Sequence, residues 1–179
     1  MAEARASWRP PVTSVSVTAW PGEAAALAAR VQAAFGLALP APGRWTAAGG
    51  MVAVWLGPDH WQVEQDGRPD LAEALADAVG AHGGVIDVSD ARAVLRLSGP
   101  GSRDVLARLL PLDLHPRVFA PGCAANSVAA HLSVQLRQID DAPSYDLGCL
   151  RGYAGSLAHA VAEAGAVLDT SPRHPPGLG

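Results

Sequence analysis

The chain contains no lysine, so all 13 of its basic side chains are arginine. A Walker-type phosphate loop requires a lysine after its second glycine. The six histidines form no His-x-His or His-Glu-x-x-His pair, and none stands at zinc spacing from a cysteine. Charged residues make up only 17% of the sequence and the net charge is −4, whereas a nucleic-acid-binding protein needs a basic face. We therefore expect no nucleic-acid partner and no metal site.

Cysteines and long apolar runs are also scarce. Cys123 and Cys149 stand far apart and form no Cys-x-x-Cys pattern, which is typical of proteins from a reducing compartment. The amino-terminal residues lack the apolar core of a signal peptide, and the apolar runs are shorter than a membrane span. These features predict a cytoplasmic protein with no membrane association. The hydrophobic content of 49% indicates that a partner covers part of the surface.

Hydrophobic periodicity predicts two successive βαββαβ units. In the first unit we expect strands over residues 12–19, 51–57, 60–65 and 85–89, a helix over 21–36, and a helix that opens at Pro69 or Asp70. In the second we expect strands over 93–99, 126–140, 144–150 and 166–171, with helices over 100–110 and 151–165. The chain is therefore predicted to be α+β, with two ferredoxin-like units packed together in one compact domain.

The two halves also share the sequences at their joints. Pro21-Gly22 recurs as Pro100-Gly101, and the closing segment VIDVS at 85–89 recurs as VLDTS at 167–171. The repeat predicts unit boundaries at 12–90 and 91–170. Residues 1–11 are expected to form a flexible arm and residues 171–179 a flexible tail.

The segment VLRLSGPGSRDVL, residues 94–106, resembles a phosphate loop only superficially. Asp104 stands where a dinucleotide-binding loop has its third glycine, and its charge would repel pyrophosphate. Arg103 could attract an anion to the helix start, but the repeated joint at Pro21-Gly22 is followed by Glu23, which disfavours an anion. We interpret both segments as structural joints.

Candidate nucleophiles and acids are equally ordinary. Cys123 lies among small residues without a nearby cation to activate it. Asp140, Asp141 and Asp146 are close in sequence, as an acid–base pair would be, but Asp-Asp-Ala-Pro-Ser is a common turn sequence. We expect no catalytic, cofactor-binding or metal-binding residue in this chain.

Two tryptophans flank a predicted hairpin tip. Trp55 and Trp61 stand on either side of Asp59 and His60. The tryptophans could pack in the core at alternate strand positions, or contact a partner, because tryptophan is enriched at interfaces. Trp55, Asp59, His60 and Trp61 are accordingly the candidate partner interface.

Three stretches, residues 54–65, 85–122 and 150–165, together resemble the gamma subunit of heterotetrameric sarcosine oxidase. The resemblance implies the fold of the folate-binding domain of aminomethyltransferases. It also implies a complex with an alpha subunit that holds NAD and tetrahydrofolate, a beta subunit that holds FAD, and a small delta subunit, with covalent FMN at the alpha–beta boundary. Such a complex oxidises sarcosine to glycine, with peroxide and formaldehyde or methylene-tetrahydrofolate as the other products.

One departure separates the chain from folate-binding relatives. They carry a catalytic aspartate in a Gly-Gly-Val-x-Asp-Asp loop between two strands of the second unit, whereas residues 127–138 contain no acid. The resemblance therefore implies a non-catalytic subunit, without a cofactor of its own, that stabilises the alpha subunit. The alternatives are a stand-alone folate-dependent methyl or aminomethyl transferase, a folate-binding protein, or a ferredoxin-like ligand sensor.

Overall fold

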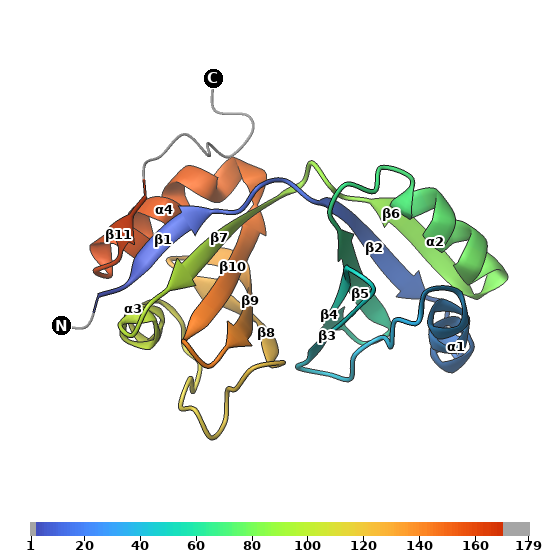
Figure 1. Ribbon diagram of the computed structural model, residues 1–179, viewed down its shortest axis with the longest axis horizontal. Helices are drawn as coiled ribbons and strands as arrows, with labels where there is room; N and C mark the ends of the chain where they lie inside the picture. The colour runs from blue at the N-terminus through green and yellow to red at the C-terminus, as the bar shows by residue number, and fades with distance from the viewer. Residues whose placement is uncertain (1–2, 170–179) are drawn as a thin grey trace. The chain divides into compact units, whose positions relative to one another are not determined.

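The computed structural model describes residues 3–169, so the expected tail at 171–179 lies outside the described residues. The chain divides into two compact units, the first spanning Val12–Ser89 and the second combining residues 1–11 with 90–179. The first unit has an antiparallel sheet and the second a mixed one, each with helices on one face (Figure 1). This arrangement confirms the α+β class. None of the helices within residues 3–169 is long and apolar enough to cross a membrane.

The first unit has a five-stranded antiparallel sheet in the order β3-β4-β5-β2-β6. Its strands are β2 (Thr13–Ala19), β3 (Trp45–Ala48), β4 (Met51–Gly57), β5 (His60–Gln65) and β6 (Gly83–Asp87). Its helices are α1 (Ala24–Phe35), α2 (Leu71–Val79) and the 3-10 helix η1 (Gly80–His82). β3 is an addition to the predicted unit, because it forms between the predicted helix at 21–36 and the predicted strand at 51–57, and pairs with β4.

The second unit has a six-stranded sheet in the order β11-β1-β7-β10-β9-β8. Its strands are β1 (Arg5–Trp8), β7 (Arg92–Ser98), β8 (Ala124–Ala129), β9 (Leu132–Asp140), β10 (Ser144–Leu150) and β11 (Val167–Leu168). Its helices are α3 (Ser102–Leu109), α4 (Ala154–Glu163) and the 3-10 helix η2 (Arg151–Tyr153). The strand predicted over 126–140 is interrupted by a two-residue turn at Ala130 and His131, whose φ values are 47° and 68°.

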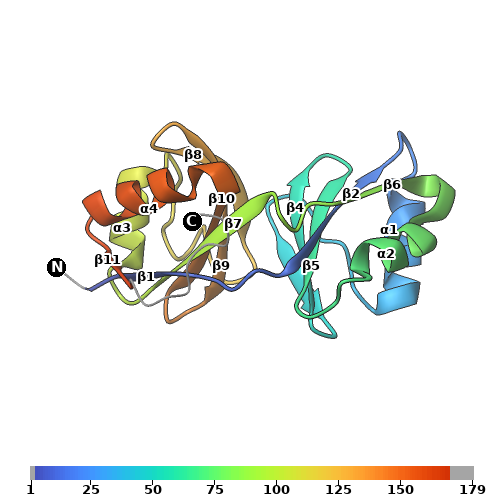
Figure 2. The same ribbon diagram turned by 90° about the horizontal axis from the view of Figure 1, so that it is seen from above.

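The amino-terminal segment is the main correction to the predicted organisation. Residues 1–11 were expected to be a flexible arm, but β1 lies inside the second sheet, antiparallel to β7 and parallel to β11 (Figure 2). The side chains of Ala4 and Ala6 are buried in the core of the second unit, and Trp8 packs against it. The prediction was wrong because a four-residue strand has no partner close to it in sequence, and short segments carry little periodicity.

Each unit buries a core of its own between its helices and one face of its sheet. In the first unit, alternate residues of β2 and β5 face residues of α1 and α2. The buried members of this core include Val15, Val17, Trp61, Val63, Leu27, Val31, Leu71 and Leu75. In the second unit the corresponding residues include Leu95, Leu97, Leu136, Tyr145, Leu147, Leu106, Leu157 and Val161. The opposite face of each sheet carries no helix, and it holds polar strand residues such as Gln62 in the first unit and Asp146 in the second (Figure 1).

Gly99 shows why the second unit requires a glycine where the segment before β1 lies against the joint. Gly99 has a φ of 102°, and a Cβ added to it would lie 2.7 Å from the carbonyl oxygen of Glu3. The same carbonyl accepts a hydrogen bond from the backbone N–H of Gly101 at 3.0 Å. The segment interpreted as a structural joint therefore fastens the start of β1 to the turn before α3.

We predict that Gly99→Ala destabilises the protein more than Gly22→Ala. Gly22 also has a positive φ, of 83°, but an added Cβ would meet nothing within 4 Å. Gly22→Ala should cost about 1 kcal/mol from backbone strain alone. Gly99→Ala should cost about 2–4 kcal/mol, because overpacking against Glu3 adds to that strain. Urea unfolding of the full chain measures both losses of unfolding free energy. Equal losses would show that the Glu3 carbonyl does not restrict the side chain at position 99.

Candidate functional site

The strongest polar feature is a buried carboxylate surrounded by arginines on the helix-free face of the second sheet. Asp146 on β10 is the cross-strand partner of Arg96 on β7 and of Arg137 on β9. The Nε and Nη2 atoms of Arg137 donate to Oδ2 of Asp146 at 3.0 and 2.9 Å, and Nη1 of Arg9 donates to the same oxygen at 2.9 Å. Nε of Arg96 donates to Oδ1. We call these four residues the Asp146 cluster.

The cluster keeps its carboxylate ionised. Asp146 is only 2% exposed, and burial by itself raises the pKa of its carboxyl group. The hydrogen bond from Arg96 and the charges of Arg137, Arg9 and Arg96 outweigh burial and lower this pKa below its ordinary value. A carboxylate held in this way is a poor general acid or base, because its pKa moves away from neutral pH. The cluster therefore connects strands, and Arg9 connects the segment after β1 to the middle of the sheet.

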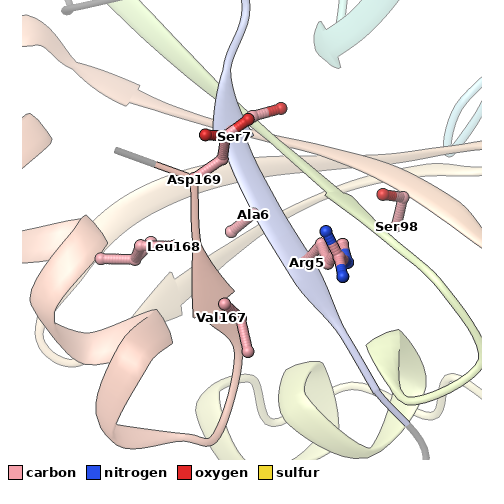
Figure 3. Close-up of a pocket in the computed structure, with 7 residues that line it drawn as sticks. All are labelled: Arg5, Ala6, Ser7, Ser98, Val167, Leu168 and Asp169. Atoms are coloured by element: carbon pink, nitrogen blue, oxygen red, sulfur yellow. The ribbon is translucent and has the colours of Figure 1, made fainter. Parts of the chain in front are cut away.

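A hollow of about 440 Å³ opens on the same face, at the β11 margin of the sheet. Figure 3 shows β1 crossing it with Arg5 and Ser7, while Ser98 lies on one side and Val167, Leu168 and Asp169 on the other. Arg5 forms an ion pair with Glu3 at 2.9 Å. The side chains offer hydroxyl groups and one charge of each sign. The hollow has the chemistry of a polar contact surface.

The arginine of the superficial phosphate loop has structural partners. Nη1 of Arg103 donates to the carbonyl oxygens of Leu114 and Phe119, and Nη2 donates to Oε1 of Gln138 at 3.3 Å. Its guanidinium also lies over the ring of Tyr145, 5.6 Å from the centroid. Arg103 thus holds the long loop between α3 and β8 against the sheet, in agreement with the interpretation of this segment as a joint.

The candidate nucleophiles and acids lie apart from one another. Cys123 and Cys149 are buried and form no disulfide. Burial raises the pKa of the Cys149 thiol to about 11 despite the opposing charge of Arg92. Asp140 accepts hydrogen bonds from the backbone N–H groups of Ala142 and Ser144, both at 3.0 Å, which is the predicted turn chemistry. No group of three potential metal-ligating His, Cys, Asp or Glu residues occurs within residues 3–169.

The tryptophans of the candidate partner interface lie on the core side of the first sheet. Trp61 is 8% exposed and its indole N–H donates to the carbonyl oxygen of Pro40 at 3.0 Å, while Trp55 packs against the same core. Asp59 occupies the hairpin tip with a φ of 55°. Nε2 of His60 lies 2.8 Å from Oγ of Ser16. Trp55 and Trp61 thus pack against the core of the first unit. A contact between Asp59 or His60 and a partner protein stays a prediction.

The Asp146 cluster was missed because Asp146 was grouped with its sequence neighbours in the turn. A signal was present, since charged residues alternate with apolar ones inside the strands that contain Arg96, Arg137 and Asp146. Charged side chains are rarely buried unless they are paired. Three such strands in one sheet indicate a cross-strand ion pair, although the strand order that joins them cannot be obtained from local periodicity.

Comparisons with known proteins agree over most of the chain. Residues 21–166 match the family model described as sarcosine oxidase, gamma subunit family. The sarcosine oxidase subunit gamma of Arthrobacter sp is 41% identical over 129 residues, which cover 69% of this chain and 62% of that relative. The matched part is therefore less than two thirds of that relative's length.

Solved structures extend the agreement to the fold. A chain of the heterotetrameric sarcosine oxidase from Corynebacterium sp. U-96, in complex with pyrrole 2-carboxylate, superposes with a TM-score of 0.80 and 31% identity, covering 90% of this chain and 83% of that one. Aminomethyltransferase T of the glycine cleavage system from Bartonella henselae superposes with a TM-score of 0.66 at 17% identity, covering 89% of this chain and 45% of that one. The second likeness shows the fold alone.

We predict that Asp146→Asn lowers the free energy of unfolding by about 3–5 kcal/mol at pH 7, because it leaves buried arginine charge uncompensated. Asp141→Asn is the matched control, since Asp141 is an exposed residue in the adjacent turn, and it should change stability by no more than about 0.5 kcal/mol. Urea unfolding of both variants measures the difference. Equal effects would show that the Asp146 cluster does not stabilise the sheet.

The pH dependence has a defined sign. The folded-state pKa of Asp146 is lowered, so its stabilisation is complete above the ordinary carboxyl pKa of about 4. It is lost as the pH falls through the folded-state value. The stability difference between wild type and Asp146→Asn should therefore be constant from pH 7 down to about 5 and shrink below about 4.

Proposed function

Because the chain belongs to the sarcosine oxidase gamma subunit family, we propose that it serves as the non-catalytic gamma subunit of a sarcosine oxidase complex. The complex oxidises the N-methyl group of sarcosine and yields glycine, peroxide, and formaldehyde or methylene-tetrahydrofolate. In this proposal the chain binds the alpha subunit and stabilises it, with beta and delta subunits completing the assembly. Its location is the cytoplasm.

The observation that carries the proposal is the structural match over most of the chain. The match to a heterotetrameric enzyme covers 90% of this chain at 31% identity, and the family match covers both units. A likeness confined to one unit would support only a shared ferredoxin-like motif, which many unrelated proteins have. Because the match covers both units, it favours the same subunit role for this chain as for the matched chain.

In the proposal, the redox chemistry takes place in the partner subunits. FAD, FMN, NAD and tetrahydrofolate are held there, and this chain holds none of them. The contacts of its polar residues support this division. Asp146 is engaged by three arginines, Arg103 by backbone carbonyls and Gln138, and the Cys149 thiol is protonated at neutral pH.

A stand-alone folate-dependent transferase is the less favoured alternative. The likeness to an aminomethyltransferase is a likeness of fold. The region where folate-binding relatives were expected to carry a catalytic aspartate is the β8–β9 hairpin, which closes through Ala130 and His131. A two-residue turn with both φ values positive is the tight type I′ form, and it leaves no room for an extended catalytic loop.

Co-expression tests the proposal. The full chain, produced together with the alpha and beta subunits of the complex, should co-purify with them in fixed stoichiometry, and omitting it should lower the thermal stability of the alpha subunit. Absence of the chain from the purified complex would refute the proposal.

Calorimetry tests the alternative. Titration of tetrahydrofolate into the isolated full chain should give no saturable heat, because the proposal assigns folate to the alpha subunit. Saturable binding would favour the folate-binding alternative over the subunit role.

A further inference from the structure

The hollow on the helix-free face of the second sheet has the size of a small-ligand site. Its volume is about 440 Å³, and ligand pockets in proteins enclose roughly 300–1,000 Å³. A small organic molecule needs only part of this space, so the chemistry of the lining decides which class of molecule fits.

One row of the lining holds the positive charge. Arg5 on β1 lies between Ser98 of β7 and Val167 of β11, which are its cross-strand partners. Arg5 and Val167 are exposed, and the exposed fraction of Val167 is 56%. A guanidinium, a hydroxyl group and an apolar side chain therefore lie next to one another in the hollow.

The next row of the lining holds the negative charge. The backbone N–H of Asp169 donates to the carbonyl oxygen of Ala6 at 2.8 Å, so the exposed Asp169 lies beside Ser7, as Figure 3 shows. Because side chains alternate along a strand, Ser7 points to the same face as Arg5. The hollow thus presents a cation and an anion on diagonal positions of β1 and the end of β11, each next to a serine hydroxyl.

The ion pair of Arg5 leaves its guanidinium accessible to a ligand. Nε of Arg5 lies 2.9 Å from Oε1 of Glu3, and the two side chains are 72% and 57% exposed. Exposed ion pairs stabilise little, because water solvates both charges. The contact with Glu3 uses Nε, whereas a ligand carboxylate can bind both terminal nitrogens of the guanidinium through two parallel hydrogen bonds.

We propose that the hollow binds a small zwitterionic α-amino acid. The carboxylate of the ligand would bind the guanidinium of Arg5, and its ammonium group would bind the carboxylate of Asp169. The hydroxyl groups of Ser7 and Ser98 would form further hydrogen bonds, and Val167 would contact the aliphatic part. A simple anion or cation fits less well, because the lining would place a like charge next to it. The inference concerns residues of this chain and does not require the proposed subunit role.

The ligand would also strengthen the margin of the sheet. β11 has two residues and pairs with β1, so few hydrogen bonds hold it. The amides of Val167 and Asp169 donate to the carbonyl oxygens of Ala4 and Ala6, both at 2.8 Å. A molecule that binds Arg5 on β1 and Asp169 beyond β11 at the same time favours the paired state by mass action. These two amides therefore report binding.

Titration of the full chain with glycine, followed by NMR, tests the site. Glycine should shift the amide signals of Val167 and Asp169 saturably, with a dissociation constant of about 1 mM, and should slow the hydrogen exchange of both amides. Acetate and methylammonium each carry one of the two charged groups, so each should bind at least about 10-fold more weakly. If glycine at about 20 mM leaves these signals unmoved, the proposal is wrong. Acetate that binds as tightly as glycine would show a plain anion site and would also overturn it.

Substitutions separate the contributions of the two charges. Arg5→Gln and Asp169→Asn should each weaken glycine binding about 10-fold or more, because each leaves one charged group of the ligand without its partner. Glu3→Gln should strengthen binding about 2- to 5-fold, because it removes the carboxylate that competes for Arg5.

Arg117→Gln is the matched control. Arg117 is an exposed arginine in the loop between α3 and β8, so its substitution should leave glycine binding unchanged. Thermal unfolding of each free variant verifies that it folds. Glycine binding that Arg5→Gln does not weaken, or that Arg117→Gln weakens equally, refutes the proposal.

Discussion

The second unit depends on the pairing of β1 with β7. β1 is the strand that joins β11 to the rest of the sheet, since β11 pairs with β1 along Arg5–Val167 and Ala6–Leu168. The segment just before β1 lies against Gly99, where a side chain would collide with the Glu3 carbonyl. Arg9, the residue after β1, donates a hydrogen bond to Asp146. Residues 3–11 thus belong to the second unit, residues 12–89 form the first unit, and residues 90–169 complete the second. Because these pairings join distant parts of the sequence, loop-closure entropy makes them slow to form, and the second unit can be completed only when both ends of the described chain are present.

Local sequence patterns were sufficient for elements whose partners are close in the chain. The β4–β5 hairpin and the strand at β10 have the predicted bounds, because alternation and short turns determine hairpins locally. β1 was missed because it has four residues and pairs with strands far along the chain. β3 was missed although its partner β4 follows after the two-residue turn Gly49-Gly50, a sequence typical of hairpins. The turn at Ala130 and His131 was also missed, because alanine rarely adopts a positive φ. The Asp146 cluster required the order of strands, which is set by the whole sheet.

The tryptophans show why an interface is hard to predict from composition. Trp55 and Trp61 stand at alternate positions around a turn, a pattern that places them on one face without indicating which face is buried. Trp20, which is 51% exposed, adjoins the joint at Pro21-Gly22, outside a periodic segment, and nothing in its immediate sequence marks it. Its exposure follows from Gly84, which lets the indole lie against the edge strand. An exposed side chain that packs on backbone is identified from tertiary structure alone.

The second unit shows how a fold shared with an aminomethyltransferase can be stabilised without a reactive site. Polar groups inside the second sheet bind one another, so they stabilise the sheet without leaving a reactive group in a cavity. Stability supplied by polar contacts within the sheet is the property that the proposed subunit role requires.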